Sequence, residues 1–189
     1  MTKEQVRLSK FLSLILRHDP DCIGLTLDRN GWANVNDLIH CASQHGTNLS
    51  VGMIEDVVRL NDKKRFVFSD DKHQIRASQG HSLKVDLQLK PQQPPSILYH
   101  GTATRFKDSI LRDGLTKQSR QHVHLSADEA TAIKVGQRHG SPVVLKVKSA
   151  TMHLQGFKFL LSDNGVWLVD HVPPQYLEVQ SYGGSGNAT

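Results

Sequence analysis

The sequence lacks most of the features that mark a secreted, membrane-bound or zinc-binding protein. Only two cysteines, Cys22 and Cys41, occur among its 189 residues. Two cysteines are too few for a disulfide framework or a thiolate metal site, and they suit a reducing compartment. There is no apolar leader segment at the start and no apolar run long enough to cross a membrane. We therefore expect a soluble cytoplasmic protein without a membrane partner.

Two common nucleotide-binding motifs are also missing. The sequence contains no Gly-x-Gly-x-x-Gly, which excludes a Rossmann dinucleotide site, and no Walker motif for ATP. What it does have is a modest excess of positive charge, with 23 lysines and arginines against 18 acidic residues. This excess favours an anionic partner but does not decide between nucleic acid and another anion.

Three helices and a hairpin are expected in the first half of the chain. Apolar residues at helical spacing predict a helix over about 5–18, which Pro20 ends, and a second helix from Val35 that Gly46 closes. Ser50 is expected to cap a third helix. Two short apolar runs at 65–68 and 74–77 flank a turn and predict a hairpin. Three helices followed by a hairpin is the order of a winged helix, a common nucleic-acid-binding scaffold.

A proline-rich stretch, Lys90–Pro95, is the best linker in the chain, and the pattern after it is dominated by strands. We expect a turn at Gly101-Thr102, a short helix closed by Gly114, and a helix through about Arg138 that Ser126 caps. Ser181 to Thr189 is expected to be a flexible polar tail. The expected strands lie at 98–100, 122–125, 143–147, 157–161, 166–169 and 176–179.

Several residues could take part in binding or catalysis, and each could instead have a purely structural role. Arg17 and His18 end a helix, where cations interact well with the helix dipole, but they could also hold a phosphate. Arg65 starts a strand on the face away from Phe66, a suitable place to meet a backbone phosphate. Both readings stay open on these residues alone.

A second group of candidates lies after the linker. His100 beside a Gly-Thr turn suits a dinucleotide that needs close backbone approach. His122 and His124 share one side of a strand, and a metal site would need a third ligand that no acidic residue or cysteine supplies at a convincing spacing. We therefore expect no metal and interpret the two histidines as hydrogen-bonding groups. The alternative is that they simply belong to a half-buried strand and have no role in binding.

Seven motifs occur in an order that resembles the RNA 2′-phosphotransferase family. The resemblance runs from about Leu8 to Val179, nearly the whole chain. Its motifs are Leu12-Ser13-x-Ile15-Leu16-Arg17-His18, Gly31-Trp32, Lys63-Lys64-Arg65-Phe66, Gln79-Gly80-His81-Ser82, Tyr99-His100-Gly101-Thr102, His122-Val123-His124-Leu125-Ser126 and Asn164-Gly165-Val166-Trp167-Leu168.

The resemblance implies a bilobal α+β protein. An N-terminal winged-helix lobe, 1–92, would bind RNA, and a C-terminal lobe of the ADP-ribosyltransferase fold, 96–180, would bind NAD, with 181–189 as the tail. It further implies that an RNA 2′-phosphate attacks the nicotinamide ribose of NAD, and that the ribose then takes the phosphate as a cyclic ester. NAD is consumed as a co-substrate, the RNA is a 2′-phosphorylated RNA such as tRNA, and we expect a monomer.

The resemblance also assigns roles to residues of this chain. The family's catalytic tetrad falls on Arg17, His18, Arg65 and Arg120. NAD binding falls on six further residues: His100, Gly101, Thr102, His124, Ser126 and Arg138.

ADP-ribosyltransferases of the ordinary kind use a His, a Tyr and a Glu, and the matching positions here look like His100, His124 and Val166. A phosphate dianion is already a good nucleophile and would be repelled by a carboxylate, so the missing Glu argues against ordinary protein ADP-ribosylation. Two alternatives remain. One is an ADP-ribosyltransferase that stops after the first step, on phosphorylated RNA or DNA ends. The other is a winged-helix binding protein with a degenerate NAD lobe.

Overall fold

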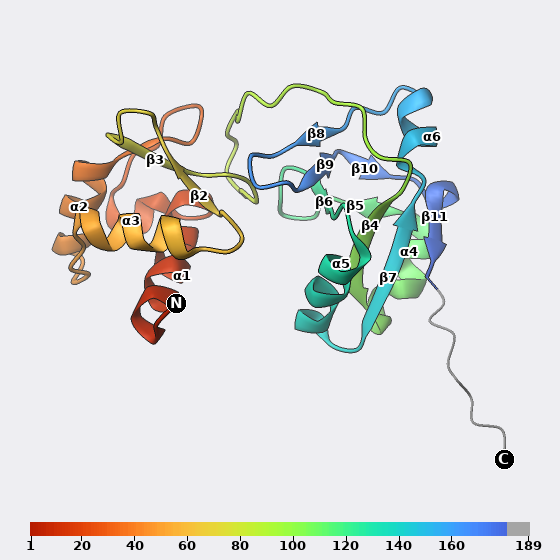
Figure 1. Ribbon diagram of the computed structural model, residues 1–189, viewed down its shortest axis with the longest axis horizontal. Coiled ribbons are helices and arrows are strands. Elements are labelled where there is room, and N and C mark those ends of the chain that lie inside the picture. Colours follow the sequence, from red (N-terminus) through yellow and green to blue (C-terminus); the bar gives the residue numbers. More distant parts are fainter. Residues whose placement is uncertain (181–189) are drawn as a thin grey trace, which may run out of the picture. The chain divides into compact units, whose positions relative to one another are not determined.

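The computed structural model describes residues 1–180, which form two compact units (Figure 1). Unit 1 contains Met1–Lys90 together with two later segments, Gln118–Gln121 and Ser162–Asn164. Unit 2 contains the remaining described residues from Pro91 onward. The tail expected at 181–189 lies outside the described residues. Each unit is described by itself below.

The helices of unit 1 begin where the sequence offers a capping side chain. Thr2 and Gln5 form a reciprocal capping box at the start of the first helix, and Asn34 and Ser50 cap the next two through side-chain acceptors. The three predicted helices are therefore confirmed. They are α1 (Lys3–Arg17), α2 (Val35–Gln44) and α3 (Val51–Leu60), with a short 3-10 turn η1 (Pro20–Ile23) after α1.

A small antiparallel sheet completes unit 1. The predicted hairpin is confirmed, with β2 (Phe66–Phe68) paired to β3 (Gln74–Ala77). A third strand, β1 (Ala33–Asn34), pairs with the other edge of β3 and was not predicted, because two residues carry too little pattern to recognise. Figure 1 shows the three helices grouped with the hairpin in this unit.

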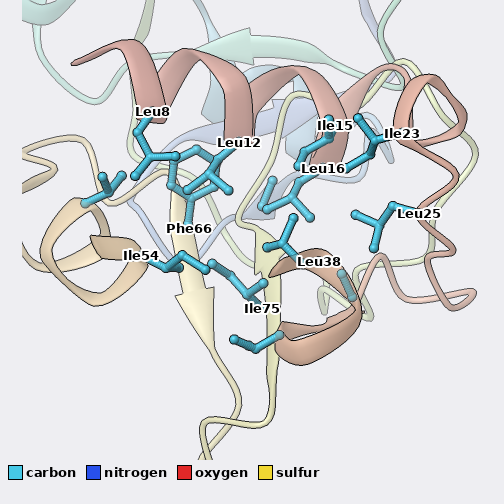
Figure 2. Close-up of a cluster of buried hydrophobic side chains, with 14 residues drawn as sticks. Leu8, Leu12, Ile15, Leu16, Ile23, Leu25, Leu38, Ile54, Phe66 and Ile75 are labelled. Atoms are coloured by element: carbon cyan, nitrogen blue, oxygen red, sulfur yellow. The ribbon is translucent and has the colours of Figure 1, made fainter. Parts of the chain in front are cut away.

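The core of unit 1 lies between α1, α3 and the hairpin. Leu12, Ile15 and Leu16 have no exposed surface, and Figure 2 shows them directed from α1 toward Phe66 and the residues below it. Spacings of three and four residues place these side chains on one helix face. The opposite face of α1 therefore lies at the surface.

Unit 2 is built mainly from antiparallel strands, as expected. The strands are β4 (Leu98–Ala103), β5 (Leu115–Thr116), β6 (Val123–Leu125), β7 (Pro142–Val147), β8 (Leu160–Leu161), β9 (Trp167–Val169), β10 (His171–Val172) and β11 (Leu177–Val179). One sheet has the order β11-β7-β4 and another the order β6-β9-β8, with a two-stranded pair of β5 and β10. The long neighbours β4 and β7 lie side by side in Figure 1, with the helix α5 (Glu129–Gly136) packed beside them.

Short helices connect these strands. The helix closed by Gly114 is confirmed, whereas α6 was not predicted because its start has no side-chain cap and its sequence only weak apolar spacing. The helices are α4 (Lys107–Asp113), α5 (Glu129–Gly136) and α6 (Ser149–Leu154), with 3-10 turns η2 (Thr104–Phe106), η3 (Gln137–His139) and η4 (Pro174–Tyr176).

The turn expected at Gly101-Thr102 is wrong, because both residues lie inside β4. Gly101 pairs with Val144 and Thr102 with Val143. A Cβ on Gly101 would lie 1.7 Å from the backbone oxygen of Ala132 in α5. The glycine therefore serves the close approach of a helix to a strand and not a change of chain direction.

The helix cap expected at Ser126 is also wrong. The backbone N–H and C=O of Ser126 both pair with Tyr99, at 2.8 and 2.9 Å, in an isolated bridge between the strand regions. The N-cap is Asp128, whose side chain accepts from the N–H of Thr131, and the helix ends at Gly136. Tertiary pairing thus overrides a local capping signal.

Four expected strands are shorter than predicted, those at 122–125, 166–169 and 176–179 by one residue each at the start. The strand at 157–161 is reduced to β8, because the N–H of Phe157 donates to Met152 at the end of α6. His122 lies before β6, so it does not share that strand with His124. Overall, the mixture of helices and small antiparallel sheets confirms the α+β class. That the units are a winged helix and an ADP-ribosyltransferase fold, with the expected limits, stays a prediction.

No helix among residues 1–180 is both long enough and apolar enough to span a membrane.

Candidate functional site

Four cationic or titratable residues from distant parts of the sequence meet in unit 1. Arg17 is the last residue of α1 and His18 its C-cap, while Arg65 directly precedes β2 and Arg120 lies in the segment Gln118–Gln121. The guanidinium of Arg17 donates to the backbone oxygen of Arg65 at 3.4 Å. We call these four residues the cationic cluster.

Mutual repulsion and burial shift the pKa values in this cluster. Burial, together with the charges of Arg65 and Arg120, lowers the pKa of Arg17 to about 10. The pKa of His18 is lowered by burial and by the charges of Arg17 and Arg120. At neutral pH Arg17 stays protonated and the neutral form of His18 is favoured. A phosphate dianion bound here would relieve the repulsion between the guanidinium groups.

Arg65 is held in place by a buried asparagine that the sequence analysis did not single out. Asn61, only 3% exposed, follows α3 and accepts from the Arg65 guanidinium and from the N–H of Lys63, each at 3.1 Å. Its amide donates to the hydroxyl of Ser9 in α1 at 3.2 Å. Asn61 therefore fixes the start of β2 against α1.

His18 and the segment with Arg120 are joined to one loop. The hydroxyl of Ser82 lies 3.0 Å from Nδ1 of His18, and the N–H of Ser82 donates to the backbone oxygen of Arg17. The same loop also holds the chain neighbour of Arg120, because the N–H of Gln121 donates to the backbone oxygen of His81. The motif that contains His81 and Ser82 was visible in the sequence, but its role in positioning the cluster was not.

The ring of His81 is itself unusual. It is 1% exposed, and neither ring nitrogen has a hydrogen-bond partner within the described chain. Burial, followed by the charges of Arg17, His18 and Arg76, lowers the pKa of His81 to about 4. His81 is therefore neutral under ordinary conditions.

The segment Ser162–Asn164 belongs to unit 1 through two polar contacts. The side-chain amide of Asn164 donates to the backbone oxygen of Lys63 at 2.8 Å, two residues before Arg65. Asp163 lies 3.5 Å from the guanidinium of Arg76, which stacks on Trp32 at 4.5 Å. The Lys63–Arg65 stretch is thus supported from both Asn61 and Asn164.

Unit 2 brings together a second group of the residues singled out from the sequence. Nδ1 of His100 in β4 lies 3.1 Å from the backbone oxygen of His124 in β6. Because a carbonyl can only accept, Nδ1 of His100 carries a proton and the bond fixes the orientation of the ring. Ser126, bridged to Tyr99, lies directly beyond them, so His100, His124 and Ser126 form one group.

The other three residues proposed for NAD binding are placed differently. The backbone of Gly101 faces α5, and Thr102 is 6% exposed. Arg138 is exposed in η3. Their roles toward a nucleotide stay predictions.

Nothing in residues 1–180 offers a cluster of three or more His, Cys, Asp or Glu side chains that could hold a metal ion. His122 is half-buried, and its lowered pKa comes first from that burial.

Comparison with known proteins identifies the family. Residues 3–171 match the model described as RNA 2′-phosphotransferase, Tpt1 / KptA family. The chain belongs to this family. Its curated relatives include the probable RNA 2′-phosphotransferase of Flavobacterium johnsoniae, 55% identical over 174 residues that cover 92% of this chain and 96% of the relative.

Two further relatives carry the same name. The protein of Pectobacterium carotovorum is 58% identical over 172 residues, covering 90% of this chain and 92% of its own. The protein of Agrobacterium fabrum is 56% identical over 173 residues, covering 92% and 93%. The RNA 2′-phosphotransferase resemblance stated from the motifs is thereby confirmed.

Proposed function

We propose that this protein removes an internal 2′-phosphate from RNA in a reaction that consumes NAD. Unit 1 would be a winged-helix RNA-binding domain and unit 2 an NAD-binding domain of the ADP-ribosyltransferase fold. A tRNA is one candidate substrate, and we expect a cytoplasmic monomer that needs no metal.

The observation that carries this proposal is the cationic cluster. Three arginines and a histidine from separate segments are gathered in unit 1, and the contributions to the pKa of Arg17 all lower it. Such a site favours a doubly charged anion. Charge-assisted hydrogen bonds of this kind contribute about 1.5–3 kcal/mol each. A phosphate attached to RNA is the anion that the family's name suggests.

In the proposed first step, an oxygen of the RNA 2′-phosphate forms a bond to C1″ of the nicotinamide ribose. The bond between C1″ and the nicotinamide nitrogen breaks, and nicotinamide leaves. No residue has to activate the phosphate, because it is already an anion. The guanidinium groups orient it.

In the second step, O2″ of the ribose attacks the phosphorus, and the bond from phosphorus to the RNA 2′-oxygen breaks. The RNA keeps a 2′-hydroxyl, and ADP-ribose 1″,2″-cyclic phosphate is released. Negative charge grows on the phosphoryl oxygens during this step, and the arginines of the cluster would stabilise it without rearranging. His18, whose neutral form is favoured, could donate or take the proton through hydrogen bonding.

The group in unit 2 has donors and acceptors that suit a dinucleotide. The ring of His100 is held in one orientation by its bond from Nδ1 to the backbone of His124, and a histidine fixed in this way suits contact with a ribose. His124 and Ser126 add polar side chains beside it. These features support NAD as the second substrate.

The test is an RNA with one internal 2′-phosphate, incubated with and without NAD, followed by separation of the RNA and nucleotide products. We expect RNA with a 2′-hydroxyl and the cyclic phosphate, only when NAD is present. A persistent ADP-ribosylated RNA would instead identify an enzyme that stops after the first step. No reaction would contradict the proposal.

Variants separate the roles of the two groups. Arg65→Ala and Arg120→Ala should slow phosphate removal by roughly 100-fold or more, as expected when a donor to a developing negative charge is lost. NAD binding, measured by calorimetry, should change little. Arg59→Ala is the matched control, because Arg59 is an exposed arginine of unit 1 paired with Asp56. Equal losses of NAD binding and phosphate removal would contradict the assignment.

A further inference from the structure

We propose that the outer face of α1 is a track for the single RNA strand that flanks the 2′-phosphate on one side. This inference rests on the proposed function, since it takes RNA to be the substrate. The track consists of Lys3, Arg7 and Lys10, which we call the α1 stripe. All three side chains are exposed.

The stripe and the cationic cluster lie on the same face of one helix. At about 100° per residue, Lys3, Arg7, Lys10 and Arg17 fall within an arc of roughly 80°, and His18 extends this arc only slightly. The arc is opposite to the buried face that carries Leu12. Lys3 and Arg17 are about 21 Å apart along the axis at a rise of ~1.5 Å per residue. The exposed Leu14 lies on this arc between Lys10 and Arg17. A backbone that leaves the cluster along α1 therefore passes one apolar side chain and then meets the three cations of the stripe.

A charged outer face is usual for a surface helix, but this one is not arranged for stability. In the described part of the chain, no carboxylate lies within ion-pair distance of Lys3, Arg7 or Lys10. Glu4, the only carboxylate of α1, makes no ion pair there either. In α3, by contrast, Arg59 pairs with Asp56 one turn earlier.

The spacing within the stripe is unfavourable for the helix itself. Lys3 and Arg7 are four residues apart and Arg7 and Lys10 are three apart, so they form like-charge neighbours that repel. Lys3 also occupies the first turn, where the helix dipole disfavours a cation. An anionic partner would offset both the repulsion between the cations and the unfavourable interaction of Lys3 with the helix dipole. RNA phosphates are the anions that the neighbouring cationic cluster is proposed to hold.

The test compares RNA binding by the wild-type protein and by the variant that combines Lys3→Gln, Arg7→Gln and Lys10→Gln. The matched control combines Lys107→Gln, Lys148→Gln and Lys158→Gln, which removes the same charge from unit 2. Three single-stranded RNAs with the same 2′-phosphate serve as probes: a dinucleotide, one extended only at its 5′ side, and one extended only at its 3′ side. Affinity is measured by fluorescence anisotropy without NAD at several salt concentrations.

We expect the stripe variant to bind the dinucleotide and one of the extended RNAs like the wild type. For the other extended RNA, three lost phosphate contacts reduce the slope of log affinity against log salt by about 2, or ~0.7 per contact. This corresponds to roughly 50-fold weaker binding at about 0.15 M salt. The melting temperature of the variant should be equal to or higher than that of the wild type, because repulsion has been removed.

Other outcomes overturn the inference. No loss, equal loss for both extended RNAs, the same loss in the control, or a lower melting temperature of the stripe variant would each do so. The proposed function is tested separately, by NAD-dependent turnover of the dinucleotide by the wild type. If turnover fails while binding to one extended RNA depends on the stripe, the track stands and the function does not.

Discussion

Replacing Gly101 by alanine should destabilise unit 2 through a backbone clash. The added Cβ would lie 1.7 Å from the oxygen and 2.6 Å from the carbon of the Ala132 carbonyl, and 2.9 Å from the nitrogen of Gly136. Real Cβ atoms keep at least 3.0 Å from such atoms, so α5 must move by 3.0 − 1.7 = 1.3 Å or more from β4. Ala132 has no exposed surface, so this shift opens a packed contact.

The cost should lie at the upper end of the range for overpacking. Overpacked cores lose about 1–3 kcal/mol when side chains can adjust, and here the obstacle is the backbone of a helix. We therefore expect a loss of about 3 kcal/mol or more, a large share of a total stability that is typically ~5–15 kcal/mol. Gly136→Ala brings its Cβ to 2.7 Å from the oxygen of Thr102, a smaller overlap, and should cost less.

Fluorescence can report on unit 2 alone. The sequence has two tryptophans, of which Trp32 is in unit 1 and Trp167 in unit 2, where it is 7% exposed. In a Trp32→Phe background, urea unfolding followed by fluorescence measures the environment of Trp167. Leu154→Ala is the control, because Leu154 lies in α6 of unit 2 and its side chain is 84% exposed.

The order of destabilisation should be Gly101→Ala, then Gly136→Ala, with Leu154→Ala close to neutral. A loss below about 1 kcal/mol for Gly101→Ala would refute the packing argument, since it is smaller than overpacking normally costs. If that variant kept its stability but lost NAD binding, the glycine would serve the nucleotide and not α5.

Two further variants test unit 1. Asn61→Ala removes three hydrogen bonds of about 1 kcal/mol each, so urea unfolding should show a loss of roughly 3 kcal/mol. Phosphate removal should also slow because Arg65 loses its support, and Asn61→Asp, which keeps both acceptor contacts, should recover much of the stability. For His81, the folded pKa of about 4 lies below its ordinary 6.5, so the unfolded state binds more protons between these values and stability falls as pH falls. This lowering corresponds to roughly 3 kcal/mol of stability lost between pH 7 and pH 4. His81→Leu should flatten this part of the stability curve, and parallel curves for the variant and the wild type would show that His81 is not responsible.

The sequence predicted local structure in unit 1 well because the signals there are themselves local. Thr2, Asn34 and Ser50 cap helices through their own side chains, and the apolar spacing of α1 matches the face that is buried. In unit 2, local signals misled at Gly101 and Ser126. A glycine and a serine that resemble a turn and a cap are used there for contact with α5 and for pairing with Tyr99.

The candidate site was predictable only as a set of residue types in family motifs. Arg17 and Arg65 lie in those motifs and Arg120 lies two residues before one of them, and the structure gathers all three in one unit. Asn61 carried one local signal, its place at the end of a predicted helix, but its contacts with Ser9 and Arg65 depend on how α1 meets β2. The spacing of apolar residues describes one helix or strand at a time, so it does not predict contacts between different elements.

Because unit 1 includes residues 118–121 and 162–164, it cannot be completed from a continuous stretch of chain. During synthesis, Arg17 and Arg65 emerge long before Arg120, and the supporting Asn164 follows later still. A nascent chain that has reached only Lys90 has three members of the cationic cluster and lacks the fourth. All four residues of the cationic cluster are therefore present only after the first part of unit 2, Pro91–Lys117, has been translated, and the supporting contact from Asn164 forms only after most of unit 2 has been made. The proposed phosphate site thus depends on synthesis of the other half of the protein.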